Sequence, residues 1–394
     1  MKSSHKRPVI AIIGGGAAGL FAAVTLALSE KHPYDILLFE RQERLGKKLL
    51  ATGNGRCNLS NLSAQATDYG QAAPFVEPAF QALSPQKTLE IFRRLGLLTR
   101  KEADGKVYPY SNQGSAVLDI LRLQCQYHGV HIQTDAEVQQ IQRHHSMFRL
   151  LTSTGQQFAH KVILATGGCA APQLGGTKSG YALGEALGHV LTPLFPALVQ
   201  VKTDSPYPKA LKGVKFEGIA TLKESHHFLA QESGEVLFTE YGLSGPPLFR
   251  LSRFIGQNSS HKQPKPLTIF LDLMPEYSTD ALLSLLLQQQ KALHNLPCEH
   301  FLTSILQKRL GQMTLKAAGI APLSRLCATL KPAELSALVQ QIKAFPFPVR
   351  GTTGWANAQV TAGGLALQHF VPTTLESRLQ PGLYAVGELL DVDG

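Results

Sequence analysis

The sequence predicts an α/β fold of the Rossmann type, into which a β domain and a helical domain are inserted. Three observations lead to this prediction. An apolar segment over residues 9–13 runs into a glycine-rich turn, and a helix-forming stretch follows at once. A second apolar segment over residues 35–39 ends on an acidic residue. The residue pattern then changes near residues 196 and 278, and strand-like segments return beyond residue 346.

The glycine-rich turn has the spacing typical of dinucleotide-binding proteins. It reads GGGAAG, so Gly14, Gly16 and Gly19 take the three glycine positions, and Glu40 follows 21 residues after the last of them. Gly14 permits a tight turn, Gly16 lets the backbone approach a pyrophosphate, and Gly19 lets the helix pack closely on the sheet. Free N–H groups at the helix N-terminus, near Ala18, would face the phosphates. Glu40 can accept hydrogen bonds from a ribose diol.

The composition indicates a soluble globular protein of two or three domains. The chain has 394 residues, of which 44% are hydrophobic and 17% are charged. Lys and Arg number 38 against 28 Asp and Glu, which gives a formal net charge of +10. Such an excess serves solubility alone or attracts a polyanionic partner such as RNA.

The sequence also predicts a cytoplasmic protein without a membrane span. Only five apolar residues separate the basic start, residues 1–7, from the three glycines, so the core of a signal peptide is missing. No stretch of about 18 apolar residues occurs in the sequence. The five cysteines form no CxxC pair and no regular framework, which is typical of reduced thiols.

The changes of pattern divide the chain into three predicted parts. Residues 1–195 and 346–394 are expected to form a discontinuous nucleotide-binding domain. Residues 196–277 carry short alternating strands between turns rich in Pro and Gly, which predicts a small β domain. Residues 278–345 are rich in Leu at helical spacing, which predicts a helical domain. Its helices are expected over residues 281–293, 301–310 and 332–342.

Three further segments accompany the glycine-rich turn. Residues 46–58 read GKKLLATGNGRCN, residues 165–168 read ATGG, and residues 382–394 read GLYAVGELLDVDG. Together they resemble, over essentially the whole chain, the HI0933-like family of FAD-dependent oxidoreductases, whose members reduce bile-acid enones or ribosomal RNA. The resemblance implies a glutathione-reductase-like FAD-binding domain with two inserted domains. It also implies that FAD is the tightly held nucleotide.

The resemblance extends the predicted cofactor site beyond the turn. The loop over residues 46–58 can adopt left-handed backbone conformations, approach a flat ligand and present cations to a pyrophosphate. Cys57 could donate a proton as a thiol or pack as a small hydrophobe beside the flavin, and Cys57 and Asn58 are the predicted catalytic residues. Besides the residues of the turn and Glu40, the predicted FAD contacts are Arg41, Lys47, Lys48, Thr52, Gly53, Asn54, Arg56, Cys57, Asn58, Thr166, Gly167, Gly168, Gly387, Glu388 and Asp391.

The sequence predicts neither a second nucleotide-binding turn nor a metal site. Because there is no second GxGxxG motif, NADH or NADPH would dock only transiently as a hydride donor, or another donor would be used. The histidine pairs at 144–145 and 226–227 lack companions at metal-ligand spacing.

The expected activity is the reduction of a carbon–carbon double bond conjugated to a carbonyl, by chemistry of the dihydrouridine-synthase type. The resemblance offers two substrates: a uridine of large-subunit ribosomal RNA, reduced to dihydrouridine, or a small enone such as a steroid. The net charge favours RNA. The cations expected to contact it are Lys202, Lys209, Lys212, Lys215, Lys223, Arg250, Arg253, Lys262 and Lys265. An RNA-binding assembly factor with a structural FAD is an alternative of another class, and the oligomeric state is not predicted.

The sequence departs from the family pattern near its end. Members usually continue past DVDG with a second glycine pair and a helix that closes over the pyrophosphate, whereas this sequence stops at Gly394. A chain that lacks this helix is expected to hold FAD more weakly, because a phosphate-facing helix N-terminus would be missing. Glu388 also replaces the Asp that most members of the superfamily carry at that position.

Overall fold

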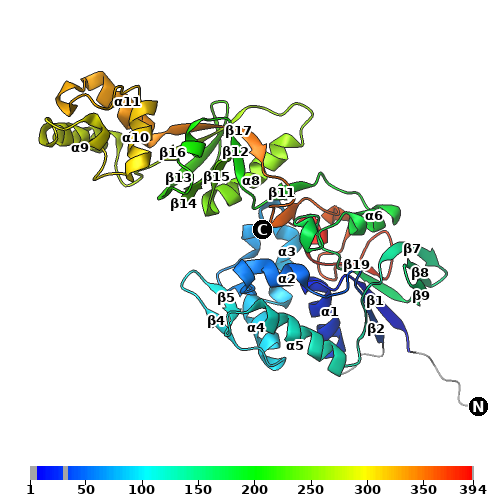
Figure 1. Cartoon of the computed structure of the whole chain (residues 1–394). Coiled ribbons are helices and arrows are strands. Elements are labelled where there is room, and N and C mark those ends of the chain that lie inside the picture. The colour runs from blue at the N-terminus through cyan, green and yellow to red at the C-terminus, as the bar shows by residue number, and fades with distance from the viewer. Residues whose placement is uncertain (1–6, 30–33, 393–394) are drawn as a thin grey trace, which may run out of the picture. The chain divides into compact units, whose positions relative to one another are not determined.

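The computed structural model describes residues 7–29 and 34–392, and it divides into two compact units (Figure 1). The first unit comprises residues 1–194 and 360–394, and the second comprises residues 195–359. Most of the basic start of the chain and the last two residues of the DVDG segment lie outside the described residues. Within the described ranges, no helix is long and apolar enough to cross a membrane.

A five-stranded parallel sheet forms the centre of the first unit, in the order β19-β10-β1-β2-β6. The middle strand is β1, an entirely apolar segment, as expected for a strand covered on both faces. Its residues Ile10–Ile13 pair with Lys161–Leu164 of β10. The strands are β1 Val9–Ile13, β2 Asp35–Phe39, β6 His131–Gln133, β10 Lys161–Leu164 and β19 Leu383–Ala385. The predicted Rossmann-type fold is thereby confirmed.

Helices α1 and α5 pack together over one face of this sheet. Leu20 and Val24 of α1 are fully buried in a cluster with Leu38 of β2 and with Val117 and Leu121 of α5. Each such side chain contributes roughly 1.5–3 kcal/mol to folding by leaving water. The helices of the first unit are α1 Ala17–Ala27, α2 Lys47–Ala51, α3 Ala73–Ala82, α4 Pro85–Arg94, α5 Gly114–Tyr127 and α6 Ser179–Ala186.

Short strands complete the first unit. One three-stranded antiparallel sheet, β3-β5-β4, follows the loop after α2, and another, β7-β8-β9, precedes β10. Their bounds, with that of β18, are β3 Ser60–Asn61, β4 Thr99–Lys101, β5 Lys106–Pro109, β7 Val138–His144, β8 Met147–Thr152, β9 Gly155–Ala159 and β18 Val360–Ala362.

A closed barrel, with strands in the order β12-β15-β14-β13-β16-β17, forms much of the second unit. Phe238, Leu271 and Phe347 are fully buried in its core, together with Leu248 and Leu251 of the neighbouring helix α8. The elements are β11 Phe195–Ala197, β12 Val201–Thr203, α7 Tyr207–Ala210, β13 Lys215–Glu224, β14 His227–Phe238, β15 Gly242–Ser244, α8 Pro246–Ser259, β16 Leu267–Asp272 and β17 Phe345–Thr352.

Strand β17 corrects the predicted domain boundary at residue 346. The sequence predicts that residues 346–394 belong to the nucleotide-binding domain. In the structure, however, β17 pairs with β16 and β12 of the barrel. The second unit therefore continues to residue 359. The return to strands that the sequence predicts here is observed, but the strand belongs to the barrel, and its Phe345 and Phe347 are buried in the barrel core.

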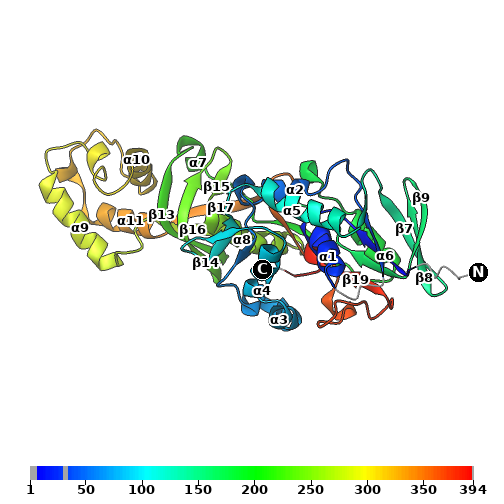
Figure 2. The ribbon, with the colours of Figure 1, turned by 90° about the horizontal axis from the view of Figure 1, so that it is seen from below.

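Three helices lie together at one end of the second unit (Figures 1 and 2): α9 Thr279–Ala292, α10 Lys308–Ala317 and α11 Pro332–Lys343. The helix predicted over residues 301–310 is wrong in position, because α10 begins only at Lys308. Gln307 fixes this start, since its side-chain oxygen accepts hydrogen bonds from the N–H groups of Arg309 and Leu310. The helices and the barrel share one buried apolar cluster.

His189 and Ser377 form a buried polar pair in the first unit. The Ser377 hydroxyl accepts hydrogen bonds from the N–H groups of Leu379 and Gln380, so we assign its own proton to His189 Nε2, 3.1 Å away. The imidazole is 3% exposed and stacks on the ring of Phe370 at 4.6 Å. Burial lowers the pKa of His189 to about 4. The fold therefore holds this histidine in its neutral form.

We predict that His189 makes the free energy of unfolding fall as the pH drops from about 6.5 to about 4. The unfolded chain binds a proton in this window and the folded chain does not, so stability is present above the window and lost within it. The difference from the usual pKa of 6.5 corresponds to about 3 kcal/mol. Urea unfolding of the wild type and of His189→Gln at pH 7.5 and 4.5 checks this. Equal pH dependence in both proteins would contradict it.

Candidate cofactor site

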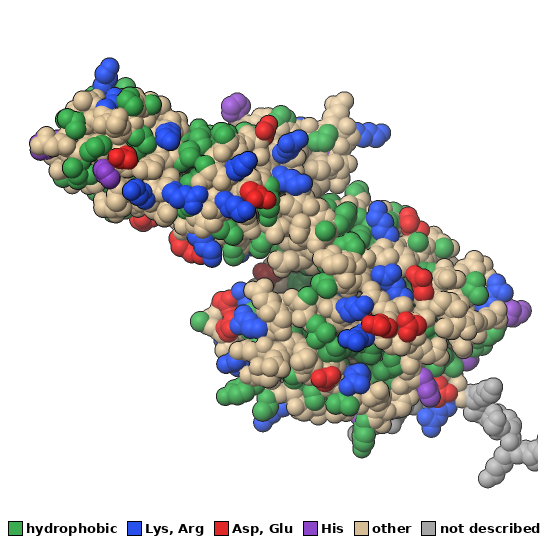
Figure 3. All heavy atoms as spheres, viewed as in Figure 1, with side chains coloured by type: hydrophobic (Ala, Val, Ile, Leu, Met, Phe, Trp, Pro, Cys, Tyr) green, Lys and Arg blue, Asp and Glu red, His purple; other side chains and the backbone are tan. Residues whose placement is uncertain are grey.

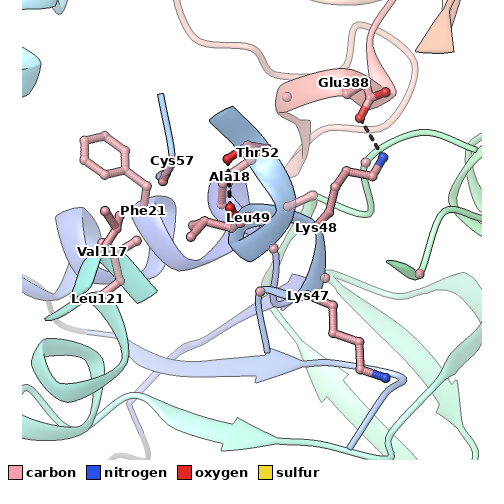
Figure 4. A pocket seen from close by; sticks show the side chains of 18 of the residues that line it. Ala18, Phe21, Lys47, Lys48, Leu49, Thr52, Cys57, Val117, Leu121 and Glu388 are labelled. Carbon is pink, nitrogen blue, oxygen red and sulfur yellow. Dashed lines mark hydrogen bonds and ion pairs between the residues drawn. The ribbon is translucent and has the colours of Figure 1, made fainter. Parts of the chain in front are cut away.

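A cavity of about 520 Å³ lies at the carboxyl ends of the parallel strands of the first unit (Figure 4). Four of the segments that form its wall follow strands of the sheet: the glycine-rich turn, the loop after β2, the end of β10 and the segment after β19. Carboxyl ends of parallel strands are where open α/β sheets bind ligands. The predicted residues that line this cavity are Gly14, Gly16, Ala18, Glu40, Lys47, Lys48, Thr52, Cys57, Asn58, Thr166, Gly167, Gly168, Gly387 and Glu388.

The three glycines of the turn have different surroundings. A Cβ atom at Gly14 would lie 2.4 Å from the carbonyl oxygen of Ala165, and one at Gly19 would lie 1.9 Å from that of Gly14. These two positions are closed to any side chain by backbone atoms, and Gly19 does not line the cavity. A Cβ at Gly16 would meet nothing within 4 Å. Gly16 therefore leaves open a space beside the N-terminus of α1, where no side chain caps the helix.

Two carboxylates of the wall are held in place by backbone N–H groups. Glu40 accepts hydrogen bonds from Gly15 at 2.8 Å and from Gln42 at 2.9 Å, one on each oxygen. A carboxylate has further lone pairs, so Glu40 can still accept bonds from ribose hydroxyls. Glu388 accepts a bond from the Thr361 N–H at 2.6 Å and pairs with Lys48 Nζ at 3.1 Å, as the dashed line in Figure 4 marks.

Thr166 places an unpaired hydroxyl in the wall. Its Oγ1 atom is buried and has no hydrogen-bond partner among the described residues. A Cβ at Gly180, near the start of α6, would lie 1.7 Å from this oxygen, so the glycine is required for the close packing. Leaving a buried polar group unpaired costs about 1–3 kcal/mol, and this atom has no exposed surface through which a ligand in the cavity could reach it.

The loop between α2 and β3 has a left-handed backbone over much of its length. Gly53, Asn54, Gly55 and Cys57 have φ values of 58°, 56°, 84° and 59°. For a side chain other than glycine this conformation costs roughly 1–2 kcal/mol. Thr52, Cys57 and the following Asn58 face the cavity, whereas Gly53 and Asn54 lie outside its wall. The two ends of the loop thus line the cavity, whereas Gly53 and Asn54 do not.

The remaining predicted contacts lie away from the main cavity. Arg56 is absent from its wall and pairs with Glu102 instead. Arg41 donates a hydrogen bond to the carbonyl of Gly175 at 3.0 Å and lines a smaller cavity of about 60 Å³ that also borders Glu40. Asp391 lies outside both cavities, and burial raises the pKa of its carboxyl.

One side of the cavity is apolar, which the sequence analysis did not predict. Figure 4 shows Phe21, Val117 and Leu121 together near Cys57, and further apolar members of this wall are Leu49, Leu59 and Phe92. The spacing of Val117 and Leu121 is a helical i, i+4 pattern, which in sequence indicates only a buried helix face. Cys57 is 5% exposed, and burial raises the pKa of its thiol, although a hydrogen bond with Thr52 opposes the shift.

The residues present fit FAD. The open position at Gly16 and the uncapped N-terminus of α1 suit a pyrophosphate, and Glu40 suits a ribose. No group of three or more acidic, His or Cys side chains suited to a metal ion occurs among the residues that the structure describes. Fold and cavity together define a Rossmann-type FAD-binding domain, the class found in FAD-dependent oxidoreductases.

Comparison with known sequences agrees with this class. The profile of the HI0933-like protein Rossmann domain matches residues 8–394, so the chain belongs to the HI0933-like family of FAD-dependent oxidoreductases. The family predicted from the sequence is therefore confirmed.

Three curated relatives match almost the whole chain. The 3-dehydro-bile acid delta(4,6)-reductase of Clostridium scindens is 37% identical over 388 residues, which cover 98% of this chain and 93% of the relative. The ribosomal RNA dihydrouridine synthase of Haemophilus influenzae is 28% identical, with 97% and 92% covered. The enzyme of the same name from Escherichia coli is 27% identical, with the same coverage.

We predict that a side chain at position 16 blocks the nucleotide without disturbing the fold. Gly16 has a φ of −83° and a ψ of −169°, which any residue adopts, and its Cβ would point into open space. Gly16→Ala should weaken FAD binding about tenfold, or about 1.4 kcal/mol, and Gly16→Val should abolish it. Fluorescence titration with FAD measures the affinity, and thermal unfolding without FAD is the control. Wild-type affinity in Gly16→Val would overturn the site.

Proposed function

We propose that this protein is an FAD-dependent reductase of a carbon–carbon double bond conjugated to a carbonyl in a small, steroid-like molecule. The observation that carries the proposal is the 37% identity to a bile-acid reductase over 98% of the chain. The relatives named as ribosomal RNA dihydrouridine synthases match a similar length at 28% and 27% identity. The bile-acid reductase has the higher identity, which favours a small enone as the substrate. The net charge alone would favour a uridine of ribosomal RNA.

The surface charges of the second unit also support a small substrate. Several of the cations expected to contact RNA form ion pairs there: Lys212 with Glu240 at 2.7 Å, Lys215 with Glu235 at 2.9 Å, Arg250 with Glu232 at 2.5 Å, and Lys265 with Glu224 at 2.8 Å. In Figure 3, acidic side chains lie among the basic ones on the visible face. Phosphate contacts would have to compete with these carboxylates, which reduces the attraction of this surface for RNA.

The residues of the cavity have separate roles in the proposal. The turn and the N-terminus of α1 hold the pyrophosphate, Glu40 holds the adenine ribose, and the Lys48–Glu388 pair orients the middle of the cofactor. When bound, FAD supplies the hydride chemistry, with NADH or NADPH as the proposed transient donor. The substrate gains the hydride at its β-carbon and a proton at its α-carbon.

Cys57 is better suited to packing than to donating that proton. Burial raises the pKa of its thiol, so the thiolate that donation would leave behind is disfavoured. Its neighbours in the apolar cluster include Leu49 and Val117. We therefore propose that the proton comes from water or another group, and that Cys57 shapes the apolar side of the cavity.

The substrate is tested by offering the FAD-loaded protein two substrates under anaerobic conditions with NADH or NADPH. The expected result is oxidation of the nicotinamide and saturation of a 3-oxo-4-ene steroid, detected by mass spectrometry. Protein-free ribosomal RNA, digested to nucleosides after the same incubation, is expected to contain no new dihydrouridine. Dihydrouridine formation without steroid reduction would overturn the proposal. A flavin that neither nicotinamide reduces would favour a structural role for FAD.

We predict that Cys57→Ala retains the rate of substrate reduction within about threefold of the wild type. Loss of a general acid typically costs a factor of about 100 or more, so the two roles are well separated. Stopped-flow reoxidation of the reduced flavin by substrate measures this step alone. A fall of about 100-fold, with FAD affinity unchanged, would identify Cys57 as the proton donor.

A further inference from the structure

Arg56 lies on the side of the 52–58 loop that faces away from the cavity, where two residues of the β4–β5 hairpin hold it. Its NH1 atom pairs with Glu102 Oε1 at 2.7 Å, and its guanidinium carbon lies 4.0 Å above the centre of the Tyr108 ring. The sequence predicts Arg56 as an FAD contact, but Arg56 does not line the cavity. Its positive charge instead interacts with the carboxylate of Glu102 and with the face of the Tyr108 ring.

The same arginine holds the left-handed part of the loop. Its Nε atom donates to the carbonyl oxygen of Gly53 at 3.4 Å, and its backbone N–H donates to that oxygen at 3.2 Å. A Cβ at Gly53 would lie 3.2 Å from the Tyr108 ring, so the ring leaves little space for a side chain at this position. The next residue, Cys57, donates its N–H to the carbonyl of Thr52 at 2.9 Å, which closes the loop on itself.

The hairpin that carries Glu102 is itself firmly anchored. Glu102 exchanges backbone hydrogen bonds within its turn, donating to Lys106 at 2.8 Å and accepting from Gly105 at 3.1 Å. Tyr108 is 4% exposed and lies in β5, paired with Arg100 of β4. A left-handed loop is thus linked to a small sheet through one arginine, whose ion pair with Glu102 has side chains 37% and 40% exposed, and the ends of that loop form part of the cavity wall.

We propose that Glu102 is a positioning residue, which acts through Arg56 to fix Thr52, Cys57 and Asn58 at the wall of the cofactor cavity. The inference rests on the proposed FAD site and adds to it a residue that never touches the cofactor. Without the carboxylate, Arg56 keeps only its contacts to Tyr108 and Gly53, and the left-handed loop is free to relax.

The first test uses the protein without FAD and follows how fast iodoacetamide alkylates each cysteine, read by peptide mass spectrometry. In Glu102→Ala, Cys57 should react about fivefold faster than in the wild type. Cys125, fully buried in α5, serves as the internal reference and should keep its wild-type rate. Glu102→Gln, which can still accept a hydrogen bond from Arg56, should restore most of the protection. Asp104→Asn removes another ion pair of the same hairpin, with Lys106, and should change nothing.

The second test is FAD affinity in the same four proteins. Glu102→Ala should raise the dissociation constant about fivefold, Glu102→Gln less than twofold, and Asp104→Asn not measurably. Wild-type Cys57 reactivity and FAD affinity in Glu102→Ala would overturn the proposal. Equal acceleration at Cys57 and Cys125 would also overturn it, because it would indicate a general loss of stability. Failure of the wild type to bind FAD would refute the cofactor site. The alkylation experiment does not depend on FAD and would still test whether Glu102 holds the loop.

Discussion

The close approach of three backbone segments at the carboxyl end of β1 is the constraint on which the site depends. Gly14 lies against the backbone of Ala165, and Gly19 lies against Gly14, with no room for a side chain at either glycine. This packing brings the N-terminus of α1 beside the end of β10, at the edge of the sheet where β2 and β19 also end. The cavity follows from it, because each of these ends leads into one segment of the wall.

The parts of the site that local geometry dictates could be predicted from the sequence. The roles of Gly14, Gly16 and Gly19 follow from spacing, because a tight turn and a close backbone approach demand glycine at fixed positions. Glu40 follows from its place at the end of the second strand. The apolar side of the cavity could not be predicted in this way, because Phe21 or Val117 in sequence is typical of any buried helix face.

The features that could not be predicted from the sequence depend on residues that are far apart in the chain and in contact in the fold. The basic loop predicts Arg56 as a cofactor contact, yet its partner Glu102 lies 46 residues away in the turn between β4 and β5. The sequence predicts strands beyond residue 346 but assigns them to the nucleotide-binding domain, whereas Phe345 and Phe347 complete a barrel whose other strands begin at residue 201. The same limit applies to net charge: an excess of +10 does not reveal which cations are paired with carboxylates, as Lys212 and Lys215 are on the barrel.

We propose that one cavity, built around the turn after β1, holds FAD with its flavin toward the 52–58 loop. A crystal structure of the protein with FAD bound is the decisive test. We expect the pyrophosphate beside Gly16 and the first turn of α1, the adenine ribose on Glu40, and the flavin ring within contact of Thr52 or Asn58. A flavin ring away from this loop, or a nucleotide bound elsewhere in the chain, would contradict it.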